Sequence, residues 1–304
     1  MTKNIGFIGL GLMGAPMVGN LCATDATIYI WNRNPAAAQK LAKQKTNITV
    51  CDSPNQVAIN CDNIIVMVTD AGAVESVVFG DSGIAEGCLQ NSLVIDMGTT
   101  SVIETRVFAE RLKTTDAQWL DAPVSGGTTA AEDGTLTIMV GGPHDAFGRA
   151  LPTLQILGDR ITHVGEVGAG QIAKSANQMI VGLTIGAVAE AFALARHNGV
   201  DPAKIREALF GGFAHSRILE LHGERMLTED YTPRAKCSIQ RKDIAEAMAL
   251  ADSVNLRLPG LSTNMKLWDL MIENDWAELD HSALLLAIDP QSVSYTHLTL
   301  PTKA

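Results

Sequence analysis

A glycine-rich turn near the N-terminus constrains the fold of this chain more than any other feature. The segment NIGFIGLGLMG begins as a short apolar strand and continues into Gly9, Gly11 and Gly14, in G-x-G-x-x-G spacing. An amphipathic segment, 15–22, and a second apolar strand, 27–31, follow it. A glycine triplet that ends a strand and opens a helix within one βαβ unit is typical of a dinucleotide site, whereas the triplet alone could be a structural turn.

Each glycine has a separate physical role in such a loop. Gly9 allows the tight turn, Gly11 lets the backbone approach a pyrophosphate, and Gly14 lets the helix pack closely on the sheet. The helix N-terminus then faces the anion with its unpaired N–H groups. We therefore predict that the whole loop, residues 9–14, binds the cofactor: Gly9, Leu10, Gly11, Leu12, Met13 and Gly14.

The residues after the second strand bear on the choice between NADP and NAD. An acidic residue is expected there in an NAD enzyme, but this chain has Asn32, Arg33 and Asn34. An acid would repel a ribose 2′-phosphate, while Arg33 can form a forked pair with it. The sequence favours NADP(H), with NAD(H) possible, and the alternative is that Arg33 simply extends into solvent.

Further strand-helix units predict an α/β fold, a Rossmann doubly wound sheet. Ligands bind at the carboxyl ends of the strands in such sheets. We therefore expect one crevice lined by Met67, Val68, Thr99 and the turn formed by Ser125, Gly126 and Gly127, here called the serine turn. The expected strands are 63–70, 92–100, 118–127, 134–143 and 161–165, with a helix over 145–157.

The second half has helical periodicity and no strand-like runs, which predicts an all-α C-terminal domain. Helices are expected over 171–197, 201–212, 238–254, 263–274 and 281–288. The first is apolar on most sides and must be buried, which suggests a homodimer or homotetramer. The expected domains are 1–165 for the cofactor, 166–288 for substrate and oligomer contacts, and a non-native or disordered tail, 289–304.

One lysine stands out in the long apolar helix. Gln171, Lys174, Asn177 and Gln178 are three and four residues apart, so they share a helix face near the domain junction. Lys174 could protonate an oxygen that becomes an alkoxide as hydride arrives, and Asn177 could orient it. A structural lysine, paired with an acid or extended to solvent, is an equally good interpretation from spacing alone.

The overall composition excludes several classes of partner. The formal net charge is −10, which argues against nucleic acid and anionic membranes. The five cysteines include no Cys-x-x-Cys pair, as expected for free thiols in a reducing compartment. We see no signal peptide, and the longest apolar run, 179–189, is too short for a bilayer. We expect a cytoplasmic protein, and no cluster has metal-ligand spacing.

Four motifs in order resemble the β-hydroxyacid dehydrogenase family, to which 3-hydroxyisobutyrate dehydrogenase belongs. They are the glycine loop, DAPVSGG (121–127), GAGQIAKSAN (168–177) and the pair Lys242-Asp243. The resemblance runs from about residue 4 to 288. It implies a catalytic lysine at Lys174, substrate on the serine turn, and cofactor contacts at Met67, Thr99 and Lys242. From the sequence alone Lys242 would be an exposed charge on a helix.

Two further segments resemble the tartronate semialdehyde reductases of this family, GGFAHSRILELHGERM (211–226) and LDHSALL (279–285). They imply reduction of a small aldehyde acid to D-glycerate. Gln178 stands where many members have a second asparagine, so either Asn177 or Gln178 could contact substrate. His215 and His281 lie in these segments, and we expect them to shape the pocket rather than to act as the acid.

Several alternatives remain open at this level. Sibling activities are 3-hydroxyisobutyrate dehydrogenase and glyoxylate or succinic semialdehyde reductase, which share the cleft and the lysine. Imine reductases generally lack the lysine, and 6-phosphogluconate dehydrogenases have a longer helical part. A non-catalytic NADP-binding module would not need Ser125, Lys174 and Asn177 together. The tail QSVSYTHLTLPTKA resembles translated vector sequence, the alternative being a natural, poorly ordered terminus.

Overall fold

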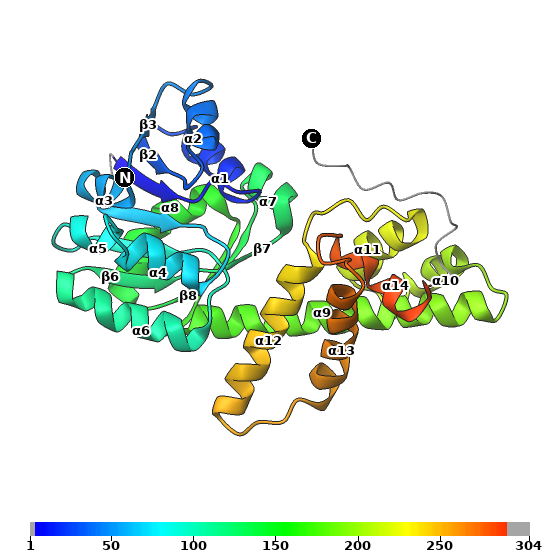
Figure 1. Ribbon diagram of the computed structural model, residues 1–304. Helices are drawn as coiled ribbons and strands as arrows, with labels where there is room; N and C mark the ends of the chain where they lie inside the picture. The colour runs from blue at the N-terminus through cyan, green and yellow to red at the C-terminus, as the bar shows by residue number, and fades with distance from the viewer. Residues whose placement is uncertain (1–3, 291–304) are drawn as a thin grey trace. The chain divides into compact units, whose positions relative to one another are not determined.

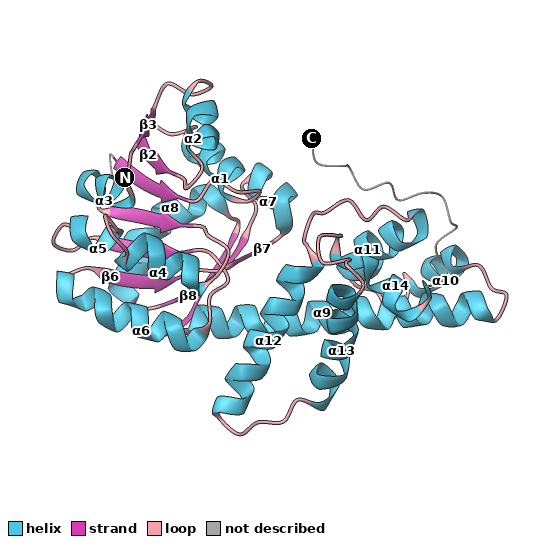
Figure 2. Cartoon of the chain, in the orientation of Figure 1, coloured by secondary structure: helices cyan, strands magenta, loops and turns pink. Residues whose placement is uncertain are grey.

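The computed structural model describes residues 4–290 and divides into two compact units, Met1–Ser175 and Ala176–Ala304. The predicted tail, 289–304, lies outside the described residues from 291 onward, but it begins too early: Asp289 is buried and lies 3.3 Å from Arg196 Nη1, so it belongs to the second unit. The division falls within one long helix, α9 (Ala169–His197), which begins in the first unit. The first unit is an α/β sheet structure and the second is helical (Figures 1 and 2).

A nine-stranded sheet forms the first unit, in the order β3-β2-β1-β4-β5-β6-β8-β7, with β9 paired to β8. Strands β1 to β6 pair in parallel. This is the Rossmann order expected from the glycine loop. The strands are β1 (Asn4–Ile8), β2 (Thr27–Trp31), β3 (Ile48–Val50), β4 (Asn63–Val66), β5 (Leu93–Asp96), β6 (Gln118–Asp121), β7 (Val124–Ser125), β8 (Thr137–Gly141) and β9 (Arg160–Gly165).

Helices cover both faces of this sheet, so its strands are buried on both sides (Figure 2). Alternate residues of one strand enter opposite cores: Phe7 packs with α1 and α8, and Ile8 packs with α3 and α4. The helices are α1 (Gly14–Leu21), α2 (Pro35–Ala42), α3 (Pro54–Asn60), α4 (Ala71–Phe79), α5 (Ile84–Gly87), α6 (Val102–Leu112), the 3₁₀ turn η1 (Lys113–Thr115), α7 (Gly127–Asp133) and α8 (His144–Leu157).

The last part of the sheet departs from the expected parallel pattern. The predicted strand over 118–127 is two strands, β6 and β7, and β8 runs antiparallel to both. Only the short α7 and a left-handed Gly134 (φ 70°) connect β7 to β8. A parallel crossover needs a dozen or more residues, so the chain instead turns back beside β7.

The second unit is helical in the part of the chain that the structure describes, apart from one isolated bridge between Lys236 and Asp280. Its core contains Trp268 and Phe192. The predicted helix over 281–288 begins as a 3₁₀ turn, which Asp280 caps by accepting the N–H of Ser282. The helices after α9 are α10 (Pro202–Leu209), α11 (Arg217–Thr228), α12 (Cys237–Ser253), α13 (Pro259–Glu273), η2 (His281–Leu284) and α14 (Leu285–Ile288).

Two glycines of α9 let α12 and α13 pack against it. A Cβ at Gly182 would lie 2.8 Å from Ile244 Cδ1 and 2.9 Å from Gln240 Nε2. A Cβ at Gly186 would lie 2.7 Å from Asn264 Nδ2. Neither space admits a methyl group without displacement, so these small residues set how closely the three helices approach.

The long helix α9 is apolar enough to pass a length and composition test for a membrane span, unlike the short run counted from the sequence. The difference arises because the test averages over an 18-residue window and tolerates up to two charged residues, whereas the uninterrupted apolar run, 179–189, is shorter. Less than half of that window is buried within the structure. A core helix passes the same test. All five cysteines are free thiols, as expected.

Candidate functional site

The three glycines of the loop lie in three different environments. Gly9 has φ 98°, and a Cβ there would lie 2.2 Å from the carbonyl oxygen of Met67. A Cβ at Gly14 would lie 2.0 Å from the carbonyl oxygen of Gly9. Gly11 is exposed, and a Cβ there would meet nothing within 4 Å. The two outer glycines are therefore required by packing, and the middle one leaves open space over the start of α1.

The polar residues after β2 complete the loop. Asn32 accepts a hydrogen bond from the Leu10 N–H at 2.8 Å and donates one to the Asn34 carbonyl at 2.8 Å. Asn34 caps α2 by accepting the Ala36 N–H. Arg33 between them is exposed. The two asparagines thus shape the backbone, and Arg33 presents the only charge of this predicted trio.

The turn after β4 lies between the glycine loop and the turn after β5. Gly9 approaches the Met67 carbonyl, and a Cβ at Gly98 would lie 2.7 Å from the Val68 carbonyl oxygen. Met67, Val68 and Thr99 are each partly exposed. The structure therefore brings three predicted cofactor positions to one edge of the sheet.

The serine turn joins β7 to α7 and has an unusual backbone. Gly126 has φ 133° and Gly127 has φ 69°, which are conformations that favour glycine. Ser125 is partly exposed and pairs with Thr137 of β8. The serine turn is therefore an exposed segment, Gly126 and Gly127, that follows directly on the Ser125 hydroxyl.

Lys174 lies on the second turn of α9 and is only 8% exposed. One turn earlier, the Gln171 side chain accepts the Thr100 N–H at 3.2 Å and donates to the Gly98 carbonyl at 2.9 Å. The helix that carries the lysine is therefore attached to the loop after β5. Lysine is seldom buried to this extent unless it is paired.

In the second unit, the other predicted polar residues of α9 contact α12. Asn177 donates to Gln178 Oε1 at 2.8 Å, and Gln178 donates to Asp243 Oδ2 at 2.6 Å and to Gln240 Oε1 at 3.2 Å. The Gln178 amide is thus used within the unit. Sequence analysis gave no role to Gln240, because its contact is visible only once α9 and α12 are packed.

Lys242 is not the exposed charge that the sequence alone suggested. Its amine lies 3.0 Å from Asp243 Oδ1 and 3.3 Å from Glu246 Oε1, and its side chain is about three-quarters buried. Burial lowers its pKa, but Asp243 and Glu246 more than compensate and raise the pKa above its ordinary value. Lys242 therefore stays protonated at neutral pH, paired with two acidic side chains of α12.

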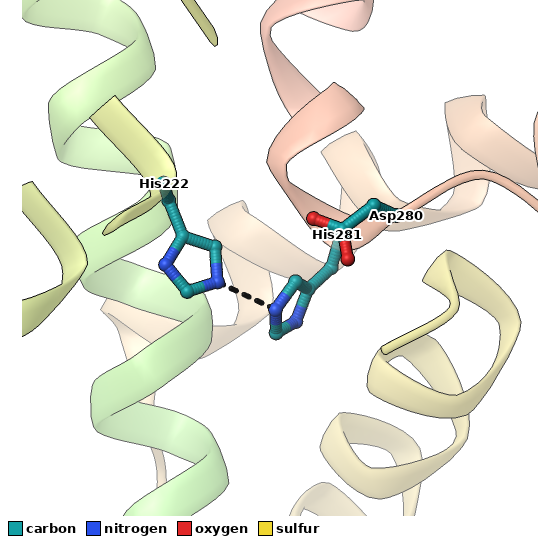
Figure 3. A group of neighbouring side chains, drawn as sticks. All are labelled: His222, Asp280 and His281. Carbon is teal, nitrogen blue, oxygen red and sulfur yellow. Dashed lines mark hydrogen bonds between the residues drawn. The ribbon is translucent and has the colours of Figure 1, made fainter. Parts of the chain in front are cut away.

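The structure brings together a histidine pair that the sequence did not indicate. His222 of α11 and His281 of η2 are buried, with their Nε2 atoms 2.6 Å apart (Figure 3). Burial, together with His281 and Arg225, lowers the pKa of His222 to about 3, so its ring is neutral. His215 lies elsewhere, exposed and 2.8 Å from Glu220.

With Asp280, this pair forms a group whose ligand atoms lie within 4.8 Å of one another. Two nitrogens bound to one tetrahedral zinc would be about 3.3 Å apart, further than the observed contact. The Asp280 oxygens already accept hydrogen bonds from Arg225, Arg234 N, Ala235 N and both the N–H and the hydroxyl of Ser282. The geometry is that of a hydrogen-bonded histidine pair beside a satisfied carboxylate.

Comparison with known proteins gives the same assignment over nearly all of residues 4–288. Residues 4–165 match the NAD binding domain of 6-phosphogluconate dehydrogenase, and residues 168–288 match NAD-binding of NADP-dependent 3-hydroxyisobutyrate dehydrogenase. The chain belongs to the 3-hydroxyisobutyrate dehydrogenase family of β-hydroxyacid dehydrogenases. As a member of this family it is an NAD(P)-dependent oxidoreductase that acts on hydroxy groups.

Individual proteins of this family are similar to the chain over nearly its full length. The 2-hydroxy-3-oxopropionate reductase of Escherichia coli K12 is 41% identical over 94% of this chain and 97% of its own length. The 3-hydroxyisobutyrate dehydrogenase of Pseudomonas aeruginosa is 32% identical over 92% of this chain and 95% of its own length. The structure of Mycobacterium tuberculosis 3-hydroxyisobutyrate dehydrogenase with L-serine superposes with a TM-score of 0.85 at 28% identity, covering 95% and 99% of the two chains.

Proposed function

We propose that this enzyme reduces tartronate semialdehyde (2-hydroxy-3-oxopropanoate) to D-glycerate with NADPH as the preferred cofactor. The observation that carries the proposal is the 41% identity, over nearly the full length of both chains, with the E. coli 2-hydroxy-3-oxopropionate reductase. The reductase-like segments at 211–226 and 279–285 support it, since the His222–His281 contact makes them one structural element.

In this proposal, separate groups of residues bind the cofactor, bind the substrate and donate the proton. The glycine loop and the start of α1 hold the pyrophosphate, with Met67, Val68, Thr99 and Lys242 as further cofactor contacts. The bound nicotinamide supplies the hydride. The serine turn binds the substrate carboxylate through backbone N–H groups and the Ser125 hydroxyl. Lys174 donates a proton to the oxygen that gains negative charge, and Asn177 orients it.

Gln178 has a supporting role in this scheme. Its amide is held by Asp243 and Gln240, and its oxygen accepts from Asn177. It therefore fixes Asn177 and borders the substrate site. Residues 1–165 form the cofactor domain and 166–288 the substrate and oligomerisation domain. Exposed Ile180 and Leu194 on α9 support a homo-oligomer, a dimer or tetramer, which a monomer in sedimentation velocity would contradict.

Substrate preference is tested by initial rates with each reduced cofactor. Tartronate semialdehyde should give a higher kcat/KM than glyoxylate or succinic semialdehyde. 3-Hydroxyisobutyrate is assayed in the oxidative direction. Discrimination of about tenfold or more is expected, because a polar site rejects analogues that leave its groups unpaired. A higher kcat/KM for any other compound would assign the enzyme to a sibling activity.

Cofactor preference is tested at Arg33. Arg33→Ala should raise KM for NADPH about ten- to a hundredfold and change KM for NADH little, because only NADPH carries the 2′-phosphate that the guanidinium pairs with. Arg33→Asp should reverse the preference. Lys43→Ala removes an exposed charge just after α2 and serves as the control. Equal effects on the two cofactors would show that Arg33 does not contact the phosphate.

A further inference from the structure

The side chain of Asp121, at the end of β6, accepts hydrogen bonds from the start of the helix that carries Lys174. Its Oδ1 accepts the Gly168 N–H at 2.8 Å, and its Oδ2 accepts the Gln171 N–H at 2.9 Å. The residue is fully buried. The first N–H groups of a helix have no partner within the helix, and here one carboxylate satisfies two of them.

Two glycines make this contact unusually close. A Cβ at Gly170 would lie 2.4 Å from the Met139 carbonyl oxygen and 2.6 Å from the Asp121 carbonyl oxygen. A Cβ at Gly141 would lie 2.7 Å from Asp121 Oδ1. The first turn of α9 therefore rests directly on the backbone of β6 and β8, and the carboxylate has no room to move.

The same strand end leads directly into the serine turn. The Ala122 N–H donates to the Asp96 carbonyl at 2.7 Å, and the Met139 N–H donates to the Pro123 carbonyl at 3.1 Å. Ser125 then pairs with Thr137 of β8. The segment from Asp121 to Ser125 is thus hydrogen-bonded to both neighbouring strands. Because Asp121 also binds the start of α9, the serine turn and the start of α9 are held by the same short segment.

We propose that Asp121 is a positioning residue for Lys174, fixing the first turn of α9 so that the amine is held at a set place relative to the serine turn. Lys174 follows Gln171 by three residues, which places it about 4.5 Å further along the helix axis on the same side. A shift of the first turn is therefore transmitted directly to the lysine. This inference rests on the proposed role of Lys174 as the proton donor.

The charge of Asp121 agrees with a positioning role. Burial raises the pKa of Asp121 to about 6, although the N–H groups of Gly168 and Gln171 lower it. Because this value exceeds the ordinary 3.8, the group stabilises the fold most in acid, and that contribution is lost as the pH rises from about 4 to about 6. At neutral pH the ionised carboxylate is thus retained at a cost in stability, as expected for a group that serves function.

A double-mutant cycle tests the proposal, with Asp121→Asn made in the wild-type and Lys174→Met backgrounds. Asparagine has the same shape as aspartate, but its NH2 group would face one of the two helix N–H groups. Two donors would then meet, and one of the two hydrogen bonds would be lost. In the wild-type background kcat should fall about ten- to a hundredfold, because small misplacements of a catalytic group have effects of this size. In the Lys174→Met background kcat should change less than about threefold, because the misplaced group is absent.

Two controls keep the outcome interpretable. Asp201→Asn replaces an aspartate that caps α10 through the Ala203 N–H, and kcat should be unchanged. NADPH affinity, measured by fluorescence, should change less than about threefold in Asp121→Asn. Asp121→Ser is used in the same cycle if Asp121→Asn does not fold.

Each result has one interpretation. An equal loss of kcat in both backgrounds, normal kcat in Asp121→Asn, or failure of both Asp121 variants to fold would overturn the positioning role and leave the proposed function intact. Near-normal turnover by Lys174→Met itself would instead reject Lys174 as the proton donor, and the inference with it.

Discussion

Lys174→Met should lower kcat by about a hundred- to ten-thousandfold while the affinity for NADPH stays within a fewfold of wild type. The loss is that of a general acid placed at the reacting oxygen. Methionine retains an apolar stem of similar length in a position that is only 8% exposed, so the fold should be preserved. Steady-state kinetics with tartronate semialdehyde measure the loss, and thermal unfolding checks that the protein is intact.

Lys174→Arg separates proton donation from simple charge. Arginine keeps the positive charge, which would stabilise an alkoxide, but it does not release a proton near neutral pH. We therefore expect kcat of Lys174→Arg to remain far below wild type. Recovery to near wild-type turnover would show that the charge alone is needed, and near-normal kcat in Lys174→Met would contradict any catalytic role for this residue.

The features that sequence predicted well are those set by short stretches of chain. Strand β2 was predicted at its observed limits, because its five residues, TIYIW, are all β-branched or aromatic. The turn at Gly9, Gly11 and Gly14 was recognised because three glycines at fixed spacing end a strand and open a helix. Short β3 and α5 were missed, since three or four residues carry no measurable period.

The features that sequence could not give depend on contacts between distant residues. Asp121 lies in a recognisable motif, but its bonds reach Gly168 and Gln171, 47 and 50 positions away. The His222–His281 contact joins residues 59 positions apart. Lys242 has acidic neighbours in the sequence, yet only the packing of α12 shows that it is largely buried. Such roles follow from tertiary packing, which local periodicity does not encode.

The same substitution at two glycines of one loop should have opposite consequences. Gly14→Ala places a methyl group 2.0 Å from the Gly9 carbonyl oxygen and 3.1 Å from the Phe7 ring. Overpacking against backbone costs about 1–3 kcal/mol or more, which lowers Tm by about 5–10 °C in a unit of this size. Thermal unfolding without cofactor measures the effect. Gly19→Ala is the control, because a methyl group there meets nothing within 4 Å.

Gly11→Ala should leave Tm within about 2 °C of wild type, because the added methyl meets no atom within 4 Å in the described structure. It should nevertheless raise Kd for NADPH about tenfold or more, since the methyl occupies the space through which the loop backbone approaches the pyrophosphate. Isothermal titration with NADPH measures this effect. The contrast separates the two uses of glycine in one loop: Gly14 is required for the chain to fold, and Gly11 is required only once a dinucleotide binds. Unchanged affinity in Gly11→Ala would mean that the pyrophosphate does not lie over this loop, and a Tm loss equal to that of Gly14→Ala would mean that the loop needs Gly11 for its own packing.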